Sequence, residues 1–219
     1  MLEHIRPHQL FTRVDTPDYG QRLVSVVLPD ARTPMLLETA VLLALIRLLR
    51  PRRVFEFGSF LGIQTLNMAA NLAPEARVYT LDLDEAAFAA ADQLDADRAI
   101  SERHLANRHH LAFAQTPYAD RVHPLYGDSN AFDFTPYRDT IDLVYVDGGH
   151  DARTVASDTR NAFAMLAGDH PAAICWHDYG NPTYPAVTAL LEKLAEAHDL
   201  YHIEGTMICL YLAGLDALT

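Results

Sequence analysis

Glycines, acids and one histidine come directly after five short apolar runs of this sequence. Packing such runs does not require acidic residues, so their repetition at this position indicates ligand binding. In an open α/β sheet, ligands bind outside the carboxyl ends of the strands. The residues that follow the runs are, in chain order, Gly58, Asp82, Gly127-Asp128, Asp147 and His177-Asp178.

Two of these acids, Asp147 and Asp178, are candidates for binding a divalent cation. If their runs form neighbouring strands, about 4.8 Å apart, the carboxylates end side by side and repel each other unless a cation or a proton lies between them. His177 is a candidate third ligand. Magnesium prefers oxygen ligands, whereas an added imidazole favours manganese, iron or zinc. The alternative is that Asp147 caps the next helix and His177-Asp178 only turn the chain.

His150 is the candidate catalytic base. It lies three residues after Asp147, roughly one helical turn if a helix begins there, and this spacing can return its imidazole to the same edge. A histidine with an ordinary pKa of about 6.5 is ready to accept a proton at neutral pH. The alternative is that His150 or Asp151 simply starts the next helix.

The segment Glu56–Gly62 carries two glycines after the first run. Glycine lets the backbone turn tightly and approach a ligand closely. A dinucleotide site requires G-x-G-x-x-G, but Phe60 and Ile63 stand at the second and third glycine positions. The loop therefore suits a nucleoside without phosphates better than NAD. Asp82, at the end of the second run, can accept both ribose hydroxyls. An ordinary strand-to-helix turn with a capping acid is the alternative.

The elements that must position these residues follow a strand–helix rhythm. The expected strands are 53–57, 77–81, 121–126, 141–146 and 172–176. The expected helices are 34–50, 62–72, 84–114, 151–166 and 185–198. This rhythm predicts an α/β fold with a doubly wound, mainly parallel sheet covered by helices on both faces. Two further runs, 200–203 and 207–212, predict a terminal hairpin, so one of them is antiparallel to the rest. The segment 85–120 is long for one crossover, and it forms either two helices or one helix with an excursion over the pocket.

Composition narrows the classes of partner. The chain has 219 residues, enough for one domain, and a formal net charge of −12 from 29 acidic and 17 basic residues. Such a surface repels nucleic acid and anionic membranes and favours a small-molecule substrate. The two cysteines are expected to be reduced core thiols. The absence of a signal core and of a long apolar stretch favours a cytoplasmic protein. The sequence does not fix the oligomeric state, and a homo-oligomer is compatible with it.

The loop sequence Glu56-Phe-Gly58-Ser59-Phe-Leu-Gly62 resembles the first motif of class I methyltransferases that use S-adenosylmethionine (SAM). Asp82 matches the ribose-binding acid of that family, and Gly127-Asp128-Ser129 matches its adenine-side turn. The resemblance implies a Rossmann-like seven-stranded sheet in the order 3-2-1-4-5-7-6, with strand 7 antiparallel. It implies SAM as the cofactor, held by these residues, and a methyltransferase domain over residues 34–219.

A narrower resemblance links Asp147-Gly-Gly-His150 and Trp176-His177-Asp178 to the macrocin-type sugar O-methyltransferases. It implies Asp147 and Asp178 as metal acids and His150 as the catalytic residue. The remaining acid of that subgroup falls on His177, so this sequence departs from the pattern there. The cation that the resemblance implies is magnesium or manganese.

The function that these patterns predict is SAM-dependent O-methylation of a small hydroxylated molecule, assisted by a divalent cation. The alternatives are a metal-independent N- or O-methyltransferase, a SAM-binding protein without turnover, and an NAD-dependent oxidoreductase. Residues 1–33, with several prolines, are expected to cover the acceptor pocket. Tyr145 and Trp176 are expected in the core, while Tyr179 and Tyr184 either line the pocket or pack elsewhere. Two groups are interpreted as solvated helix faces: His104, His109 and His110, and Asp92, Asp95 and Asp97.

Overall fold

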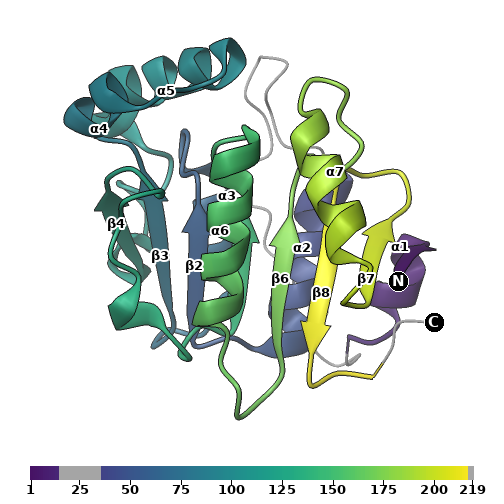
Figure 1. Cartoon of the computed structure of the whole chain (residues 1–219). Coiled ribbons are helices and arrows are strands. Elements are labelled where there is room, and N and C mark those ends of the chain that lie inside the picture. The colour runs from purple at the N-terminus through teal and green to yellow at the C-terminus, as the bar shows by residue number, and fades with distance from the viewer. Residues whose placement is uncertain (15–35, 217–219) are drawn as a thin grey trace.

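Eight strands form one mixed sheet in the computed structural model, which describes residues 1–14 and 36–216 (Figure 1). The order across the sheet is β1-β7-β8-β6-β5-β2-β3-β4. The strands are β1 (Leu2–Ile5), β2 (Arg53–Phe57), β3 (Arg77–Asp82), β4 (Val122–Tyr126), β5 (Leu143–Val146), β6 (Ala172–Trp176), β7 (Leu200–Ile203) and β8 (Cys209–Ala213). Only β8 runs antiparallel to its neighbours, β6 and β7. All five predicted internal strands and the terminal hairpin are therefore confirmed.

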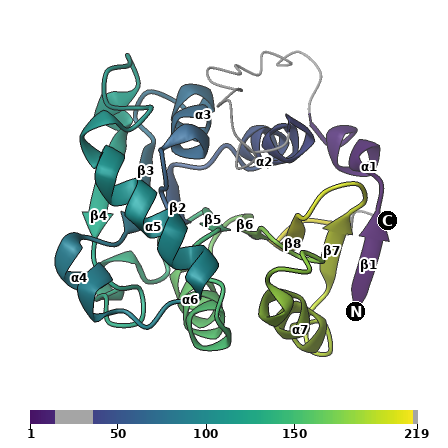
Figure 2. The same cartoon turned by 90° about the horizontal axis from the view of Figure 1, so that it is seen from above.

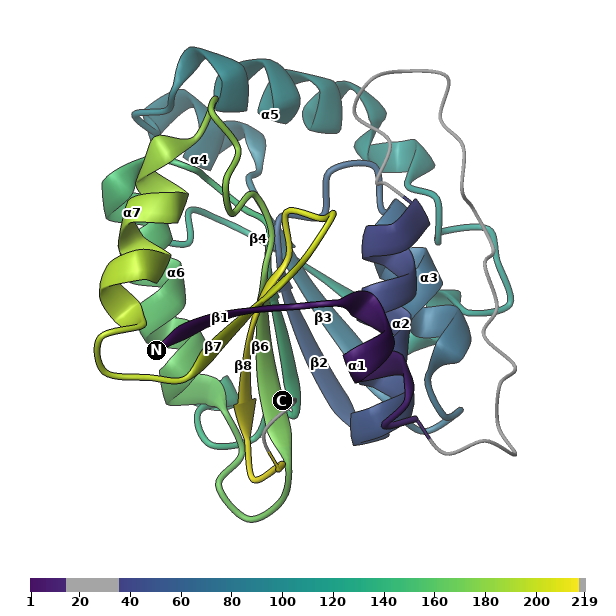
Figure 3. The same cartoon turned by 90° about the vertical axis from the view of Figure 1, so that its right-hand side faces the viewer.

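The predicted count of seven strands is wrong by one. Strands β2 to β8 stand in the order implied by the resemblance, but Leu2–Ile5 adds an eighth strand at the edge. It pairs in parallel with β7, from Leu2 opposite Leu200 to Ile5 opposite Ile203. This pairing closes the edge that β7 would otherwise expose to solvent. Figure 3 shows β1 and the short helix α1 (Pro7–Phe11) in front of that edge.

Helices cover both faces of the sheet (Figure 2). On one face lie α1, α2 (Leu36–Leu49) and α3 (Ile63–Asn71); on the other lie α6 (Ala152–Met165) and α7 (Pro185–Leu194). The central strands are buried along nearly their whole length, because both of their faces are covered. The predicted doubly wound arrangement is confirmed.

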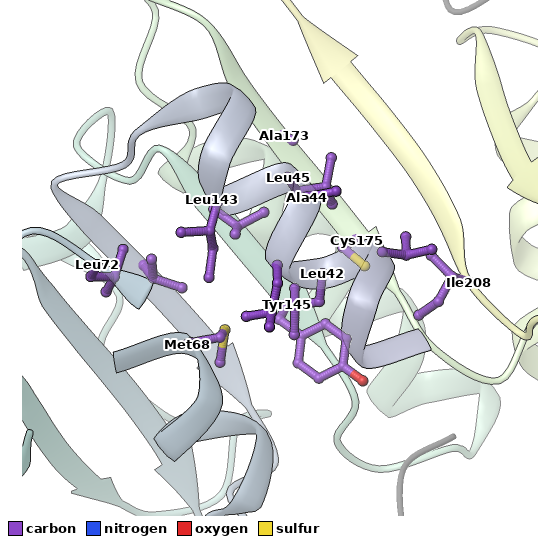
Figure 4. Close-up of a cluster of buried hydrophobic side chains, with 14 of the residues drawn as sticks. Leu42, Ala44, Leu45, Met68, Leu72, Leu143, Tyr145, Ala173, Cys175 and Ile208 are labelled. Atoms are coloured by element: carbon purple, nitrogen blue, oxygen red, sulfur yellow. The ribbon is translucent and has the colours of Figure 1, made fainter. Parts of the chain in front are cut away.

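The apolar core divides into two clusters, one on each face of the sheet. On the α2 side, Leu42 and Leu45 pack with Tyr145 and Cys175 of the central strands (Figure 4). On the α6 side, Trp176 is buried and its indole N–H donates to the Thr159 hydroxyl at 3.0 Å. Both cysteines are buried free thiols. The core positions of Tyr145 and Trp176 are as predicted.

The long segment after β3 forms two helices, α4 (Glu85–Ala90) and α5 (Asp95–Asn107), followed by a short 3-10 turn. Figures 1 and 2 show them lying across the carboxyl ends of the parallel strands, with α5 crossing above β2. We call α4 and α5 the cap. Within the described ranges, no helix combines the length and apolarity needed to cross a bilayer.

Candidate active site

A pocket of about 810 Å³ lies at the carboxyl edge of the sheet, beneath the cap. Loops after five parallel strands contribute to its wall, as the repeated acids and glycines predict. The predicted site residues that line it are Glu56, Gly58, Ser59, Asp82, Asp128, Ser129, Asp147, His150, His177 and Asp178. Gly62 lies one residue before Ile63, which also lines it. Residues 1–14 do not line the pocket, and most of the predicted N-terminal cover lies outside the described residues.

The loop after β2 requires its two glycines. Gly58 has φ +86°, and a Cβ there would lie 2.1 Å from the Asp147 carbonyl oxygen. Gly62 has φ +75°, and a Cβ there would lie 2.8 Å from the Phe113 ring. Residues with side chains rarely adopt such φ values. The missing side chain at Gly58 lets the loop pack directly against the end of β5, beside Asp147, and the missing side chain at Gly62 makes room for the Phe113 ring.

Asp82 fixes the same loop from the end of β3. Its Oδ2 accepts backbone N–H bonds from Ser59 at 2.9 Å and Phe60 at 2.8 Å, and its Oδ1 accepts one from Leu83 at 2.7 Å. A carboxylate has about four acceptor sites, so three amides leave capacity for a ligand hydroxyl. Asp82 thus shapes the loop and still lines the pocket.

Glu56 lies beneath the loop and is almost completely buried. Its Oε2 accepts hydrogen bonds from the hydroxyls of Thr65 and Thr80, both at 2.5 Å. Burial raises the pKa of Glu56 to about 8, and the two hydroxyls offset only part of this effect. The raised pKa favours the neutral carboxylic acid at neutral pH, and the side chain supports the loop from below.

Asp128 and Ser129 form the turn after β4. The Asp128 carboxylate accepts the Asn130 backbone N–H at 2.8 Å, which holds the turn in shape. Ser129 is hydrogen-bonded to Asp158 of α6. Burial raises the pKa of Asp158 to about 7. Sequence reasoning missed Asp158, because an acid inside an amphipathic helix gives no sign that it faces a neighbouring loop.

Asp147, His150 and Asp178 converge in the same pocket, from the loops after β5 and β6. One ligand atom from each lies within 4.8 Å of the other two. The N-cap of α6 is Asp151, which accepts the N–H groups of Arg153 and Thr154. Asp147 is therefore not the helix cap, and His150 precedes the helix with its imidazole in the pocket wall.

The Asp178 carboxylate joins two imidazoles. Its Oδ2 lies 2.8 Å from His150 Nε2 and 3.0 Å from His177 Nδ1. Burial raises the pKa of Asp178, but these two contacts outweigh it and hold the pKa well below its usual range. Asp178 also has φ +64°. Aspartate tolerates this left-handed conformation better than most residues, and such backbone outliers cluster at functional sites.

His177 lies beside these three residues and is fixed by a further acid. Its Nε2 is 3.1 Å from Glu38 Oε2, and its Nδ1 is 3.3 Å from Asp147 Oδ1. Glu38, on α2, is buried and also accepts the Met207 backbone N–H at 2.8 Å. The predicted role of His177 as a metal ligand stays a prediction. Glu38 was missed, since it lies in an apolar helical pattern far from any strand end.

His150 has two carboxylate partners rather than one. Its Nδ1 is 2.7 Å from Asp97 Oδ1, opposite the Nε2 contact with Asp178. Burial lowers the pKa of His150, but both contacts outweigh it and raise the pKa to about 9. The expectation of an ordinary pKa is therefore wrong. The Tyr184 ring stacks on the imidazole with 3.8 Å between ring centroids, which places Tyr184 in the pocket wall.

Two residues of the cap differ from prediction. Asp97 was expected on a solvated acidic face but is buried, and His104 was expected to be exposed but is 1% exposed. Both lie on the face of α5 that points to the edge of the pocket. Asp97 contacts His150 there, and His104 Nδ1 lies 2.6 Å from the Phe60 carbonyl oxygen. Asp92, Asp95, His109 and His110 are exposed, as predicted.

Together the doubly wound sheet and the pocket at its carboxyl edge define an α/β protein that binds a ligand at its strand ends. The chain belongs to the methyltransferase domain family, which matches residues 55–179. No curated protein sequence matches it significantly.

Solved structures of methyltransferases share the fold. The O-methyltransferase TomG of Streptomyces achromogenes, in complex with SAM, is 20% identical; the match covers 86% of this chain and 84% of TomG with a TM-score of 0.56. An O-methyltransferase of Bacillus cereus, in complex with SAH, is 16% identical over 85% and 84% of the two chains, with a TM-score of 0.57. The SAH-bound methyltransferase PaMTH1 of Podospora anserina is 16% identical over 86% and 83%, with a TM-score of 0.57.

Proposed function

We propose that this methyltransferase transfers a methyl group from SAM to a hydroxyl of a small molecule, assisted by a divalent cation. The observation that carries the proposal is the convergence of Asp147, His150 and Asp178 beside the glycine loop, in one pocket. The SAM and SAH complexes of structures with the same fold support the choice of cofactor. The resemblance of the motifs around His150 and Asp178 to macrocin-type enzymes supports oxygen as the methyl acceptor.

The cofactor is held by the loop from Gly58 to Gly62 and by the acids that flank it. Asp82 binds a ribose hydroxyl with its remaining acceptor capacity, while Asp128 and Ser129 contact the base. Glu56 keeps the loop in shape from below, since its carboxyl group is engaged by two threonines. When bound, SAM supplies an electrophilic methyl group, so the main task of the protein is to position the acceptor oxygen.

The donor set fits a divalent cation such as magnesium or manganese. Carboxylate oxygens of Asp147 and Asp178 converge from the ends of neighbouring strands, β5 and β6, within the span of one coordination sphere. A bound cation supplies a Lewis acid that lowers the pKa of the acceptor hydroxyl. His177 is held by Glu38 and contacts both acids, so it orients them or acts as a further ligand.

His150 accepts the proton of the acceptor hydroxyl. Asp97 and Asp178 fix the plane of its ring, and Tyr184 stacks on the ring. Burial lowers the pKa of the imidazole, but the contacts with Asp178 and Asp97 raise it to about 9, which favours the protonated form at neutral pH. A cation held by Asp147 and Asp178 would weaken the interaction of Asp178 with Nε2 and so would favour the neutral imidazole, which can accept the proton. The role of His150 and the role of the cation are therefore linked through one carboxylate.

The predicted N-terminal cover, residues 1–33, precedes the methyltransferase domain of residues 34–219. Residues 1–14 contribute an edge strand and a short helix instead of pocket wall. The covering role therefore falls on residues 15–33, which lie outside the described part of the chain. Glu38, the third residue of α2, does line the pocket.

Methyl transfer from labelled SAM to a panel of small hydroxylated acceptors tests the proposal. The protein is stripped with a chelator and then supplied with magnesium, manganese or zinc. We expect activity to fall on chelation and return with magnesium or manganese, and Asp178→Ala to abolish the metal-stimulated part. Full activity after exhaustive chelation would favour the metal-independent alternative, with His150 as the only catalytic group.

A further inference from the structure

The face that α5 turns toward the protein is polar. Its buried residues are Asp97, Ser101 and His104, and α4 has no buried residue. Positions four and three apart lie on one side of a helix, so these three residues form a single stripe. A helix that covers a domain usually docks through an apolar stripe. The most deeply buried contacts of the cap are therefore polar, with Ala96 as a smaller apolar contact to the core.

Two anchors hold the polar stripe, and they reach different parts of the pocket. Asp97 accepts the backbone N–H of His150 at 2.9 Å and contacts His150 Nδ1 at 2.7 Å. His104 Nδ1 lies 2.6 Å from the Phe60 carbonyl oxygen and 3.5 Å from Asp82 Oδ2. One anchor thus ends on the candidate base, and the other ends on the loop assigned to the cofactor.

We propose that Asp97 is a positioning residue that couples closure of the cap to the orientation of His150. A carboxylate on one imidazole nitrogen sets the ring orientation and decides which nitrogen carries the proton. With the cap closed, Asp97 holds Nδ1 and thereby turns Nε2 toward Asp178 and the pocket. With the cap open, the ring loses this partner. The inference rests on the proposed function, in which His150 accepts the acceptor proton.

Polar docking makes this coupling reversible. Hydrogen bonds within the protein exchange for hydrogen bonds with water at small net change in free energy, whereas an apolar helix face would resist exposure to water. The pocket lies beneath the cap, so opening the cap gives the cofactor a route in and out. When the cap closes again, Asp97 returns to His150. The catalytic arrangement is therefore complete only while the pocket is covered.

The first test compares Asp97→Asn with Asp95→Asn, the same substitution at an exposed position of the same helix. We expect Asp97→Asn to lower kcat by roughly 10- to 100-fold, the usual effect of removing a carboxylate that orients a histidine. Its KM for SAM should stay within about threefold, because the loop contacts are unchanged. Asp95→Asn should leave both constants at wild-type values. An unchanged kcat in a folded Asp97→Asn protein would overturn the proposal.

A double-mutant cycle shows whether Asp97 acts through His150. If it does, Asp97→Asn should have almost no further effect on kcat in a His150→Gln background, since residues that act as one unit are strongly non-additive. An equal fold-loss in both backgrounds would mean that Asp97 acts by another route, and would overturn the proposal.

The contact can also be followed without turnover, by NMR of the His150 ring nitrogens in the whole protein with and without SAH. Asp97→Asn should shift the Nδ1 signal and Asp95→Asn should not. If wild-type protein fails to methylate any acceptor, the proposed function fails, whereas the ring signals still report on Asp97. Identical Nδ1 signals in wild type and Asp97→Asn would contradict the positioning role itself.

Discussion

Replacing Glu56 by glutamine should change how the stability of the protein depends on pH. Glu56 is buried under the glycine loop, and burial raises its pKa from 4.5 to about 8. Between these values the folded protein keeps the proton while the unfolded chain has released it. Stability therefore falls as pH rises through this window, because folding must take up a proton.

The size of the effect follows from the shift. One pKa unit corresponds to about 1.4 kcal/mol, so this group alone lowers the free energy of unfolding by roughly 4 kcal/mol between pH 5 and pH 8. Glu56→Gln removes the ionisation and keeps an oxygen that can accept both threonine hydroxyls. The free energy of unfolding of Glu56→Gln should therefore increase relative to that of wild type by about 4 kcal/mol as the pH rises from 5 to 8. For a domain of this size the difference corresponds to on the order of 10 °C in Tm.

Thermal or urea unfolding of both proteins, followed by circular dichroism at pH values from 5 to 8, measures this difference. Glu75→Gln is the matched control, because Glu75 is exposed, just before the start of β3, and should leave the pH dependence as in wild type. A stability gap between Glu56→Gln and wild type that stays constant with pH would refute the argument. In that case the carboxyl group would be ionised in the folded state despite its burial.

Three further variants test the site. Gly58→Ala should lower stability by on the order of 2–6 kcal/mol and disrupt cofactor binding, because its Cβ would meet the Asp147 carbonyl at 2.1 Å in a left-handed conformation; wild-type unfolding curves would count against the loop geometry. His150→Ala should reduce kcat by roughly 10²–10⁴ with SAM affinity nearly unchanged, and kinetic assays that show full turnover would exclude His150 as the base. Deleting residues 1–20 should leave SAM binding intact and impair turnover. A thermal melt of the truncated protein measures the stability lost with β1, and full activity of that protein would show that this segment does not cover the pocket.

Sequence reasoning located the strand ends because their signal is local. Each central strand is a short apolar run that ends in a glycine or an acid, and the topology of a parallel sheet brings such ends to one edge. Asp147 and Asp178 could therefore be paired across β5 and β6 before their distance was known. The terminal hairpin was equally readable, since three residues separate its two strands in the sequence prediction, too few for anything but a turn.

The residues that were missed owe their positions to contacts across long stretches of chain. Asp97 has polar neighbours in sequence and is typical of an exposed helix, and only the path of α5 over the sheet brings it to His150, 53 positions later. Glu38 meets His177 across 139 positions. Strand β1 is four residues long and is defined by the free edge of β7 rather than by its own pattern. Neither periodicity nor spacing carries such information.

Calorimetric titration with SAM and with NAD tests the central claim most directly, because SAM binding to the loop between β2 and α3 underlies every further step. Wild-type protein should bind SAM and its demethylated product and should not bind NAD. Asp82→Ala should weaken SAM binding by about 1.5–3 kcal/mol, the contribution of hydrogen bonds to a charged group, partly through the loop amides of Ser59 and Phe60 that Asp82 holds. Absence of SAM binding, or binding of NAD in its place, would contradict the account.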